Sequence, residues 1–366
     1  MPLLTALRER TANVRSRPLE VFRKLRWTRS LETLPDSPLR EKLRWWPRGF
    51  RVESARLYGF PGPDHADYVS DFWSAHRSRW FNPSEAFYEH KAARRAMLLA
   101  MGAAQVEAVG LLYRGRVVLH PFDPGQCPVT SDELERWLIA DGGEFIVKPE
   151  NGGKGNSVYL VRSADGRLIA QRGGSQAPFR VSECYERMTL IERRAEQDSF
   201  WRNLFPHTVN TIRLLTLWRD GEKTPFIAAA TQKIGTAASV PVDNFAKGGL
   251  AAPVDIETGR VGAARSKNDL VKRLARHPET GAAIEGIHLP GWRALCDEVL
   301  RITAAFPGDC FVGWDVFRDA AGRTVIVEAN GWSTGVQILQ MEAGLLRDPR
   351  VRGFYDDAER RAGVRV

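Results

Sequence analysis

Three oxygen-bearing side chains lie close together in the C-terminal part of the sequence. Glu328 and Asn330 are two positions apart in the apolar segment Thr324–Asn330, so in a strand both project from the same face. Asp315 lies on a second strand-like segment, across a polar turn. A hairpin would bring the three together, and two carboxylates with an amide suit Mg²⁺, which takes oxygen ligands. The pattern fits equally well three polar residues on the solvated face of an amphipathic hairpin.

A lysine followed by a glycine-rich loop forms a second candidate site. Lys148 ends an apolar segment, and Gly152, Gly153 and Gly155 follow it before the next apolar segment. The lysine could present its charge to a polyphosphate, and backbone N–H groups of the glycines could close over phosphate oxygens. The Gly-Lys-Ser/Thr ending of a Walker loop is missing. A hairpin with a glycine-rich turn has the same composition, but the downstream carboxylate hairpin favours a phosphate site.

The order of these motifs resembles the ATP-grasp superfamily. Leu190–Glu192 resembles the strand that meets adenine, and the segment after Asn210 resembles the arginine strand of amino-acid ligases in this superfamily. More narrowly, roughly residues 54–345 resemble the sugar-transfer associated ATP-grasp family. Four segments carry this narrower resemblance: His207–Leu217, His277–Gly281, Leu289–Trp292 and Val312–Asp315.

The resemblance implies ATP and Mg²⁺ as cofactors and a role for each matching residue. Lys148 would hold the α- and β-phosphates under the loop glycines, Lys233 would be the second cation near the phosphates, and Glu192 would contact adenine. Arg213 would stabilise the transferring phosphoryl group or a tetrahedral intermediate.

The metal and substrate sites follow from the same resemblance. It implies Asp315, Glu328 and Asn330 as the Mg²⁺ ligands. Many dipeptide ligases carry an arginine two residues before this aspartate, whereas this chain has Gly313, so we expect Arg213 to supply the guanidinium. An Asn…Gly-Gly loop contributes the substrate-binding candidates, which are Asp243, Asn244, Lys247 and Gly248.

The expected fold class is α+β, an ATP-grasp fold in which two α+β subdomains clasp ATP, with a helical basic N-terminal extension. We expect a basic helical arm over residues 1–53, a pre-grasp region over 54–143, a lid subdomain over 144–192, and a large subdomain over 193–366 with the metal and substrate sites.

Within the large subdomain, Asp269–His277 is predicted to be a basic helix. His277 either contacts an acidic substrate or is structural. Lys91 falls where relatives often carry a lysine, but we expect it to be a surface lysine on a helix.

Composition indicates a soluble globular protein. The 366 residues are 43% hydrophobic and 27% charged. No apolar run approaches the ~20 residues that span a bilayer. The four cysteines are scattered without a Cys-x-x-Cys pair, which is typical of buried thiols in a reducing compartment. We therefore expect a cytoplasmic protein.

Most of the net charge of +9 lies at the N-terminus. Residues 1–51 hold thirteen Lys/Arg against five Asp/Glu. Leu19, Phe22 and Leu25 recur there at helical spacing among cations. Such a helix either packs its apolar stripe on the protein body or lies on an anionic membrane surface, here the inner face of the membrane. No nucleic-acid recognition motif accompanies the charge, so a nucleic-acid partner is not expected.

Three functions fit this sequence. The first is an ATP- and Mg²⁺-dependent carboxylate–amine ligase that acts through an acylphosphate, on an amino acid and an amino sugar, a polysaccharide or a peptide-like metabolite. The second is an ATP-grasp kinase that phosphorylates a hydroxyl, with Asp243 as the candidate general base. The third is a non-catalytic nucleotide-binding protein. The ligase is the main hypothesis, with a small-molecule or saccharide-linked substrate.

Overall fold

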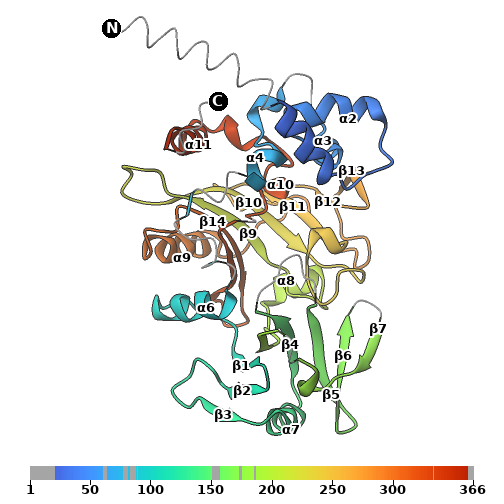
Figure 1. Ribbon diagram of the computed structural model, residues 1–366, viewed down its shortest axis with the longest axis vertical. Coiled ribbons are helices and arrows are strands. Elements are labelled where there is room, and N and C mark those ends of the chain that lie inside the picture. Colours follow the sequence, from blue (N-terminus) through green and yellow to red (C-terminus); the bar gives the residue numbers. More distant parts are fainter. Residues whose placement is uncertain are drawn as a thin grey trace, which may run out of the picture. The chain divides into compact units, whose positions relative to one another are not determined.

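A computed structural model describes residues 21–60, 64–76, 81–82, 88, 90–150, 157–172, 175–184, 187–332 and 334–361. The chain divides into two compact units. The first combines Met1–Phe81 with Gln340–Val366, and the second is Asn82–Leu339. Figure 1 shows helices in the first unit and both β-sheets in the second.

The first unit is helical and has an aromatic core. Its elements are a helix over residues 21–30, α2 (Leu39–Trp45), η1 (Trp46–Arg48), α3 (Val52–Tyr58), η2 (Asp64–Asp67), α4 (Asp71–His76), η6 (Leu345–Arg347) and α11 (Pro349–Arg361). Phe50, Tyr58, Phe60 and Tyr68 pack in edge-to-face or stacked pairs. Gln340 joins the two chain segments, because its amide nitrogen donates to the Tyr58 hydroxyl at 3.0 Å and to a backbone carbonyl at 2.8 Å.

The basic arm is partly packed into this unit. Trp27 lies against Phe72 and His76, with ring centroids 5.5 and 4.6 Å apart. Val21 and Phe22, in contrast, expose 46% and 60% of their surface. Of the predicted apolar stripe, Phe22 is exposed, Leu25 is half-buried and Leu19 lies outside the described residues. Trp27, which is not part of that stripe, packs into the unit, and membrane association of the stripe stays a prediction. Among the described residues, no helix has the length and apolar character needed to cross a bilayer.

An eight-stranded antiparallel sheet lies in the second unit (Figure 1, teal to green). Its strand order is β3-β2-β1-β8-β4-β5-β6-β7. Helix α7 (Ser131–Asp141) begins with a capping box between Thr130 and Glu133, and it buries Leu134 and Leu138 in the core of the sheet. The strands are β1 (Ala108–Tyr113), β2 (Arg116–Leu119), β3 (Cys127–Val129), β4 (Glu144–Pro149), β5 (Tyr159–Ala164), β6 (Arg167–Arg172), β7 (Ser175–Pro178) and β8 (Thr189–Arg193), with η4 (Val181–Cys184) before β8.

A seven-stranded antiparallel sheet forms the other half of this unit, in the order β13-β12-β11-β10-β9-β14-β15. One face is apolar, because residues such as Leu214 and Trp314 pack there against Leu98, Trp201 and Val299 from helices. The helices and short turns are α6 (Lys91–Ala100), α8 (Ser199–Leu204), η5 (Phe245–Lys247), α9 (Trp292–Ala304) and α10 (Val336–Leu339). The strands are β9 (Ile212–Leu217), β10 (Phe226–Ile234), β11 (Leu250–Val254), β12 (Ala264–Ser266), β13 (Asp269–Leu274), β14 (Phe311–Arg318) and β15 (Thr324–Asn330).

The α+β fold class is confirmed, and two local expectations are wrong. Asp269–Leu274 is strand β13, not a helix, because Ser266 pairs with Asp269 and Ala264 with Leu274 in a tight antiparallel connection. Of the four cysteines, all free thiols, only Cys296 is buried. Strands β1–β3 belong to the same sheet as the expected lid strands. The division into four expected domains stays a prediction.

The absence of a side chain at Gly313 has a steric cause. A Cβ atom there would lie 2.5 Å from the carbonyl oxygen of Thr334 and 2.8 Å from its Cα. The backbone of the segment after β15 thus passes directly over β14. An arginine at this position, as in many dipeptide ligases, would therefore require the backbone at Thr334 to shift.

Replacing Gly313 with alanine should destabilise the protein. The clash is with backbone, which cannot rotate away as a side chain can, so we expect a loss of about 1–3 kcal/mol in unfolding free energy. Guanidinium unfolding of the variant measures it. Gly125→Ala is the control, because a Cβ at Gly125 meets nothing within 4 Å. Equal unfolding midpoints for the two variants would contradict the close approach of Thr334.

Candidate active site

The polar face of the seven-stranded sheet carries a row of charged residues across three adjacent strands. Arg213 on β9 pairs in register with Asp315 on β14, and Asp315 pairs with Glu328 on β15. Cross-strand partners share a face of a sheet, as do residues two apart along a strand. Asn330 therefore lies on the same face as Glu328. The hairpin predicted from the sequence is confirmed, and it brings the three expected metal ligands together.

Asp315 is the centre of this row. Its carboxylate accepts two hydrogen bonds of 2.7 Å from Arg213, one from Nε and one from Nη2, and its Oδ1 lies 3.3 Å from Nζ of Lys233. All three side chains are buried. Burial alone would raise the pKa of Asp315, but the charges of Arg213 and Lys233 and their hydrogen bonds hold that pKa at about 2. The carboxylate is therefore ionised at neutral pH.

Lys233 is held by three oxygen atoms. Its Nζ lies 3.1 Å from Oδ1 of Asp243 and 3.1 Å from Oγ1 of Thr211, in addition to the contact with Asp315. Burial lowers the pKa of Lys233, but the charges of Asp243 and Asp315 outweigh this effect and raise it. The ammonium is thus a fixed positive charge beside the candidate metal ligands.

Glu328 and Asn330 are more accessible than Asp315. The Glu328 side chain is 33% exposed, and Oε1 lies 3.4 Å from Nζ of Lys91. Asn330 donates its amide N–H to the carbonyl of Gly313 at 3.2 Å, leaving the amide oxygen as the atom that could bind a cation. In the described part of the chain, no three His, Cys, Asp or Glu side chains cluster as metal ligands. Two carboxylates and an amide fit Mg²⁺, which keeps water and phosphate as its other ligands.

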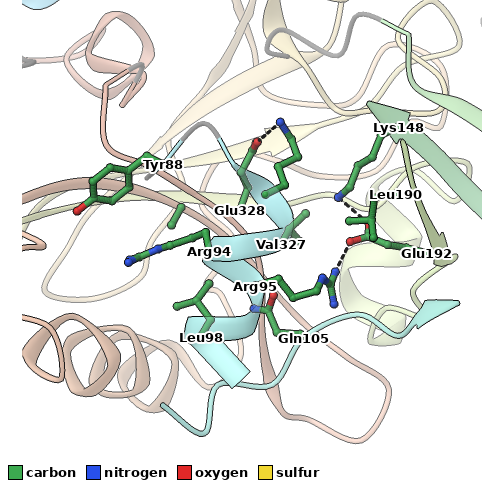
Figure 2. Close-up of a pocket in the computed structure, with 12 residues that line it drawn as sticks. Tyr88, Arg94, Arg95, Leu98, Gln105, Lys148, Leu190, Glu192, Val327 and Glu328 are labelled. Atoms are coloured by element: carbon green, nitrogen blue, oxygen red, sulfur yellow. Dashed lines mark hydrogen bonds and ion pairs between the residues drawn. The ribbon is translucent and has the colours of Figure 1, made fainter. Parts of the chain in front are cut away.

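The eight-stranded sheet contributes a second charged group (Figure 2). Ile146 on β4 pairs with Glu192 on β8, so Lys148 lies diagonally across from Glu192 on the same face. Nζ of Lys148 is 2.6 Å from Oε2 of Glu192, and Arg95 of α6 contacts Oε1. Glu192 is 4% exposed. Burial would raise the pKa of Glu192, but the charges of Lys148 and Arg95 lower it below its ordinary value.

A cleft of about 650 Å³ connects the two groups. The predicted site residues that line it come from both sheets and the loops between them: Lys148, Glu192, Arg213, Lys233, Asp243, Asn244, Asp315, Glu328 and Asn330. The size is that of a small-molecule site, and cations, carboxylates and apolar walls converge in it. The arrangement can neutralise a polyphosphate on one side and place a divalent cation on the other.

The predicted substrate loop lies beside this cleft, and the side chains of Asp243 and Asn244 already have hydrogen-bond partners. Asp243 accepts hydrogen bonds from the backbone N–H and the hydroxyl of Thr211, at 2.7 and 2.6 Å. Asn244 caps η5 through a bond from the N–H of Ala246. Lys247 lines a second cavity, of about 420 Å³, and Gly248 has a φ of 98° at the end of η5. Gly152, Gly153 and Gly155 lie outside the described residues.

The sequence did not identify Lys91 and Arg95 as cations of the site, and it left the role of His277 open. Lys91, expected on the surface, is 16% exposed and contacts Glu328, and Arg95 contacts Glu192. Their spacing of four residues places both on one face of α6, a signal visible in the sequence. His277 is structural, because its ring is 1% exposed, Nε2 lies 2.8 Å from the carbonyl of Gly235, and Nδ1 accepts two backbone N–H groups.

The sequence matches the sugar-transfer associated ATP-grasp family over residues 130–352. This match covers more than half of the chain and includes both sheets of the cleft except β1–β3. The chain belongs to the sugar-transfer associated ATP-grasp family. No curated protein matches its sequence.

Three solved structures illustrate the likeness of this ATP-grasp chain to known folds. N5-carboxyaminoimidazole synthetase from Staphylococcus aureus, complexed with ADP, is 9% identical, with a TM-score of 0.40 over 70% of this chain and 48% of its own. VanG D-Ala:D-Ser ligase from Enterococcus faecalis is 11% identical, with a TM-score of 0.39 over 74% and 62%. L-amino acid ligase from Bacillus licheniformis is 12% identical, with a TM-score of 0.36 over 70% and 43%. The chain thus spans about half the length of the first structure.

The two carboxylates of this ATP-grasp site should differ in their effect on stability. Asp315→Asn leaves Arg213 and Lys233 buried without their shared anion, so we expect a loss of about 3–5 kcal/mol in unfolding free energy. Glu328→Gln alters a partly exposed side chain and should cost about 1 kcal/mol or less. Guanidinium unfolding of both variants measures the difference. Similar losses would contradict the central position of Asp315.

The contribution of Asp315 to the free energy of unfolding should decrease as the pH falls. Its pKa in the folded protein is about 2, below the ordinary value of 3.8, so the contribution is present above about pH 4. It is lost as the pH falls from about 4 towards 2, because the protonated carboxyl then resembles the neutral amide of Asp315→Asn. The stability difference between wild type and this variant should shrink over that range. A constant difference would contradict the assignment.

Proposed function

We propose that the protein is an ATP- and Mg²⁺-dependent ligase that joins a carboxylate to an amine through an acylphosphate. The observation that carries this proposal is the convergence of Lys91, Lys148 and Lys233 with the Asp315–Glu328 pair on one cleft. Phosphoryl transfer needs little covalent chemistry from a protein, so positioning and charge neutralisation account for most of the catalysis.

Each side of the cleft has a separate task in this proposal. Lys148 binds phosphate oxygens of ATP from the eight-stranded sheet, and Glu192 lies at the strand that meets adenine. Asp315, Glu328 and Asn330 would hold Mg²⁺, which would screen the charge on the β- and γ-phosphates. Lys233 is a fixed positive charge close to the metal ligands. Arg213 keeps Asp315 oriented and would also supply the guanidinium that stabilises the transferring phosphoryl group or a tetrahedral intermediate.

The reaction balances in two steps. A carboxylate oxygen of the first substrate attacks the γ-phosphorus, the bond to the β-phosphate oxygen breaks, and ADP leaves. The amine nitrogen of the second substrate then attacks the acyl carbon, inorganic phosphate leaves, and the amine gives up a proton to form the amide. No covalent protein nucleophile is required. The cleft must exclude water, because an acylphosphate hydrolyses readily.

The contacts of Asp243 favour a ligase over a kinase. A kinase that phosphorylates a hydroxyl needs a general base within reach of that hydroxyl. Asp243, the candidate for this role, is 6% exposed and accepts bonds from the N–H and hydroxyl of Thr211 and from Lys233. Its Oδ1 thus already has Lys233 as a partner, and its Oδ2 has Thr211. The substrate is proposed to be a small molecule or a saccharide-linked compound with a carboxylate or an amine.

Hydroxylamine offers a test that does not require the natural amine. The protein is incubated with ATP, Mg²⁺, hydroxylamine and a pool of amino acids, hydroxy acids and uronic acids, and the products are analysed by mass. A ligase should convert one acid to its hydroxamate and release ADP and phosphate in equal amounts. The Glu328→Gln variant should form none. A phosphorylated pool member with ADP but no free phosphate would contradict the ligase and establish a kinase.

Replacing Lys148 should weaken nucleotide binding through the phosphates. We expect Lys148→Met to lower the affinity for ATP and ADP by about 10- to 100-fold, because a charge-assisted contact with phosphate is lost. Adenosine should bind the variant and the wild type equally. Isothermal titration of the three ligands measures these effects. Unchanged ATP affinity in the variant would contradict the phosphate role of Lys148.

A further inference from the structure

We propose that Arg95 is a positioning residue that frees Lys148 for the nucleotide by keeping Glu192 neutralised. The inference rests on the proposed function, because it takes Lys148 as the phosphate-binding lysine. It assigns a role in nucleotide binding to α6, which lies outside the matched residues 130–352.

The geometry places one buried carboxylate between two cations. Oε2 of Glu192 lies 2.6 Å from Nζ of Lys148, and Oε1 contacts Nη2 of Arg95. The side chains of Glu192 and Arg95 are each 5% exposed, whereas that of Lys148 is 12% exposed. Figure 2 shows Arg95 and Lys148 approaching Glu192 from opposite sides. The carboxylate therefore has a separate oxygen for each cation.

Arg95 and Lys148 differ in their access to the cleft. Lys148 and Glu192 line both the 650 Å³ cleft and a neighbouring cavity of about 20 Å³, room for about one water molecule. Arg95 lines the small cavity and not the cleft. Arg95 is also anchored on its far side, because Nη1 donates to the carbonyl of Val106 and the guanidinium lies 5.8 Å from the ring centroid of Phe122. Arg95 is thus the fixed partner of Glu192, and Lys148 is the partner that a ligand can reach.

A nucleotide phosphate and Glu192 compete for the same ammonium. If Lys148 were the sole partner of Glu192, its transfer to a phosphate would leave a buried carboxylate without a counter-charge, which is strongly unfavourable. With Arg95 in place, the carboxylate keeps one cation while Lys148 moves. The fraction of protein with Lys148 available to the ligand sets the apparent affinity. Arg95 therefore raises nucleotide affinity without contacting the nucleotide.

The experiment compares ligands with and without phosphates on the full-length protein. Arg95→Met should lower the affinity for Mg²⁺·ATP and for ADP by at least about tenfold, because Lys148 is then retained by Glu192. Adenosine, which has no phosphate, should bind the variant as it binds the wild type. Isothermal titration at fixed ionic strength measures all three. The double variant Arg95→Met/Glu192→Gln should recover the wild-type ratio of ATP to adenosine affinity, because a neutral amide no longer retains the lysine. The ratio cancels any change at adenine, which Glu192 is expected to contact.

Arg94→Met is the matched control. Arg94 is the neighbouring residue of α6, is equally buried and pairs with Asp309 instead of Glu192. The variant should lose stability, but its ratio of ATP to adenosine affinity should equal that of the wild type. A reduced ratio in the control would assign the effect to disturbance of α6 as a whole and overturn the role of Arg95.

Other outcomes separate this inference from the proposed function. If Lys148→Met weakens ATP binding while Arg95→Met does not, the role of Arg95 is wrong and the nucleotide site stands. Equal losses for ATP and adenosine in Arg95→Met, or no recovery in the double variant, would also overturn it and indicate a packing role. A wild-type protein that binds no ATP would overturn the proposed function, and the inference with it.

Discussion

The structure around the candidate active site depends on one buried interaction, the ion pair that Asp315 forms with Arg213 and Lys233. Three adjacent strands, β10, β9 and β14, contribute one member each, so the interaction requires their register. Burying charges is costly unless they are paired and hydrogen-bonded, and the two bonds of 2.7 Å from Arg213 meet that condition. The apolar opposite face provides the packing on which this polar arrangement rests.

The cations of the cleft share a second feature: each already has a carboxylate partner. Lys148 contacts Glu192, Lys91 contacts Glu328, and Lys233 contacts Asp243 and Asp315. A polyphosphate with its metal ion can take over these contacts with little change in local charge balance. An uncharged ligand cannot take over these contacts, because it offers the lysines no negative charge in place of their carboxylates. The arrangement therefore favours anionic ligands. This exchange links nucleotide binding to the helix α6, which provides Lys91 and Arg95.

Much of the fold and part of the site could be predicted from the sequence. Alternating apolar residues around Lys148 and Glu328 gave the strands, and the spacing of Glu328 and Asn330 placed both on one face. The helix predicted at Asp269 failed, because its apolar residues are too few to show a period and the pairing with β12 decides the conformation. Lys91 and Arg95 were missed because their partners, Glu328 and Glu192, lie about a hundred residues or more away in sequence.

From the sequence, the three candidate metal ligands are equivalent. In the structure they differ in burial and in their contacts. Asp315 is both a ligand candidate and part of the buried ion pair, whereas Glu328 is partly exposed and Asn330 donates to Gly313. Such a difference arises from side chains on neighbouring strands, which a single segment of sequence does not contain. It explains why a substitution at Asp315 reports on stability and on chemistry together, while one at Glu328 reports mainly on chemistry.

The most direct test of this account is a crystal structure of the protein with Mg²⁺ and a non-hydrolysable ATP analogue. We expect the metal ion between Asp315 and Glu328, the phosphates in contact with Lys148, and Arg95 still paired with Glu192. Phosphates bound elsewhere, with Lys148 still on Glu192 and no metal ion at Glu328, would contradict it.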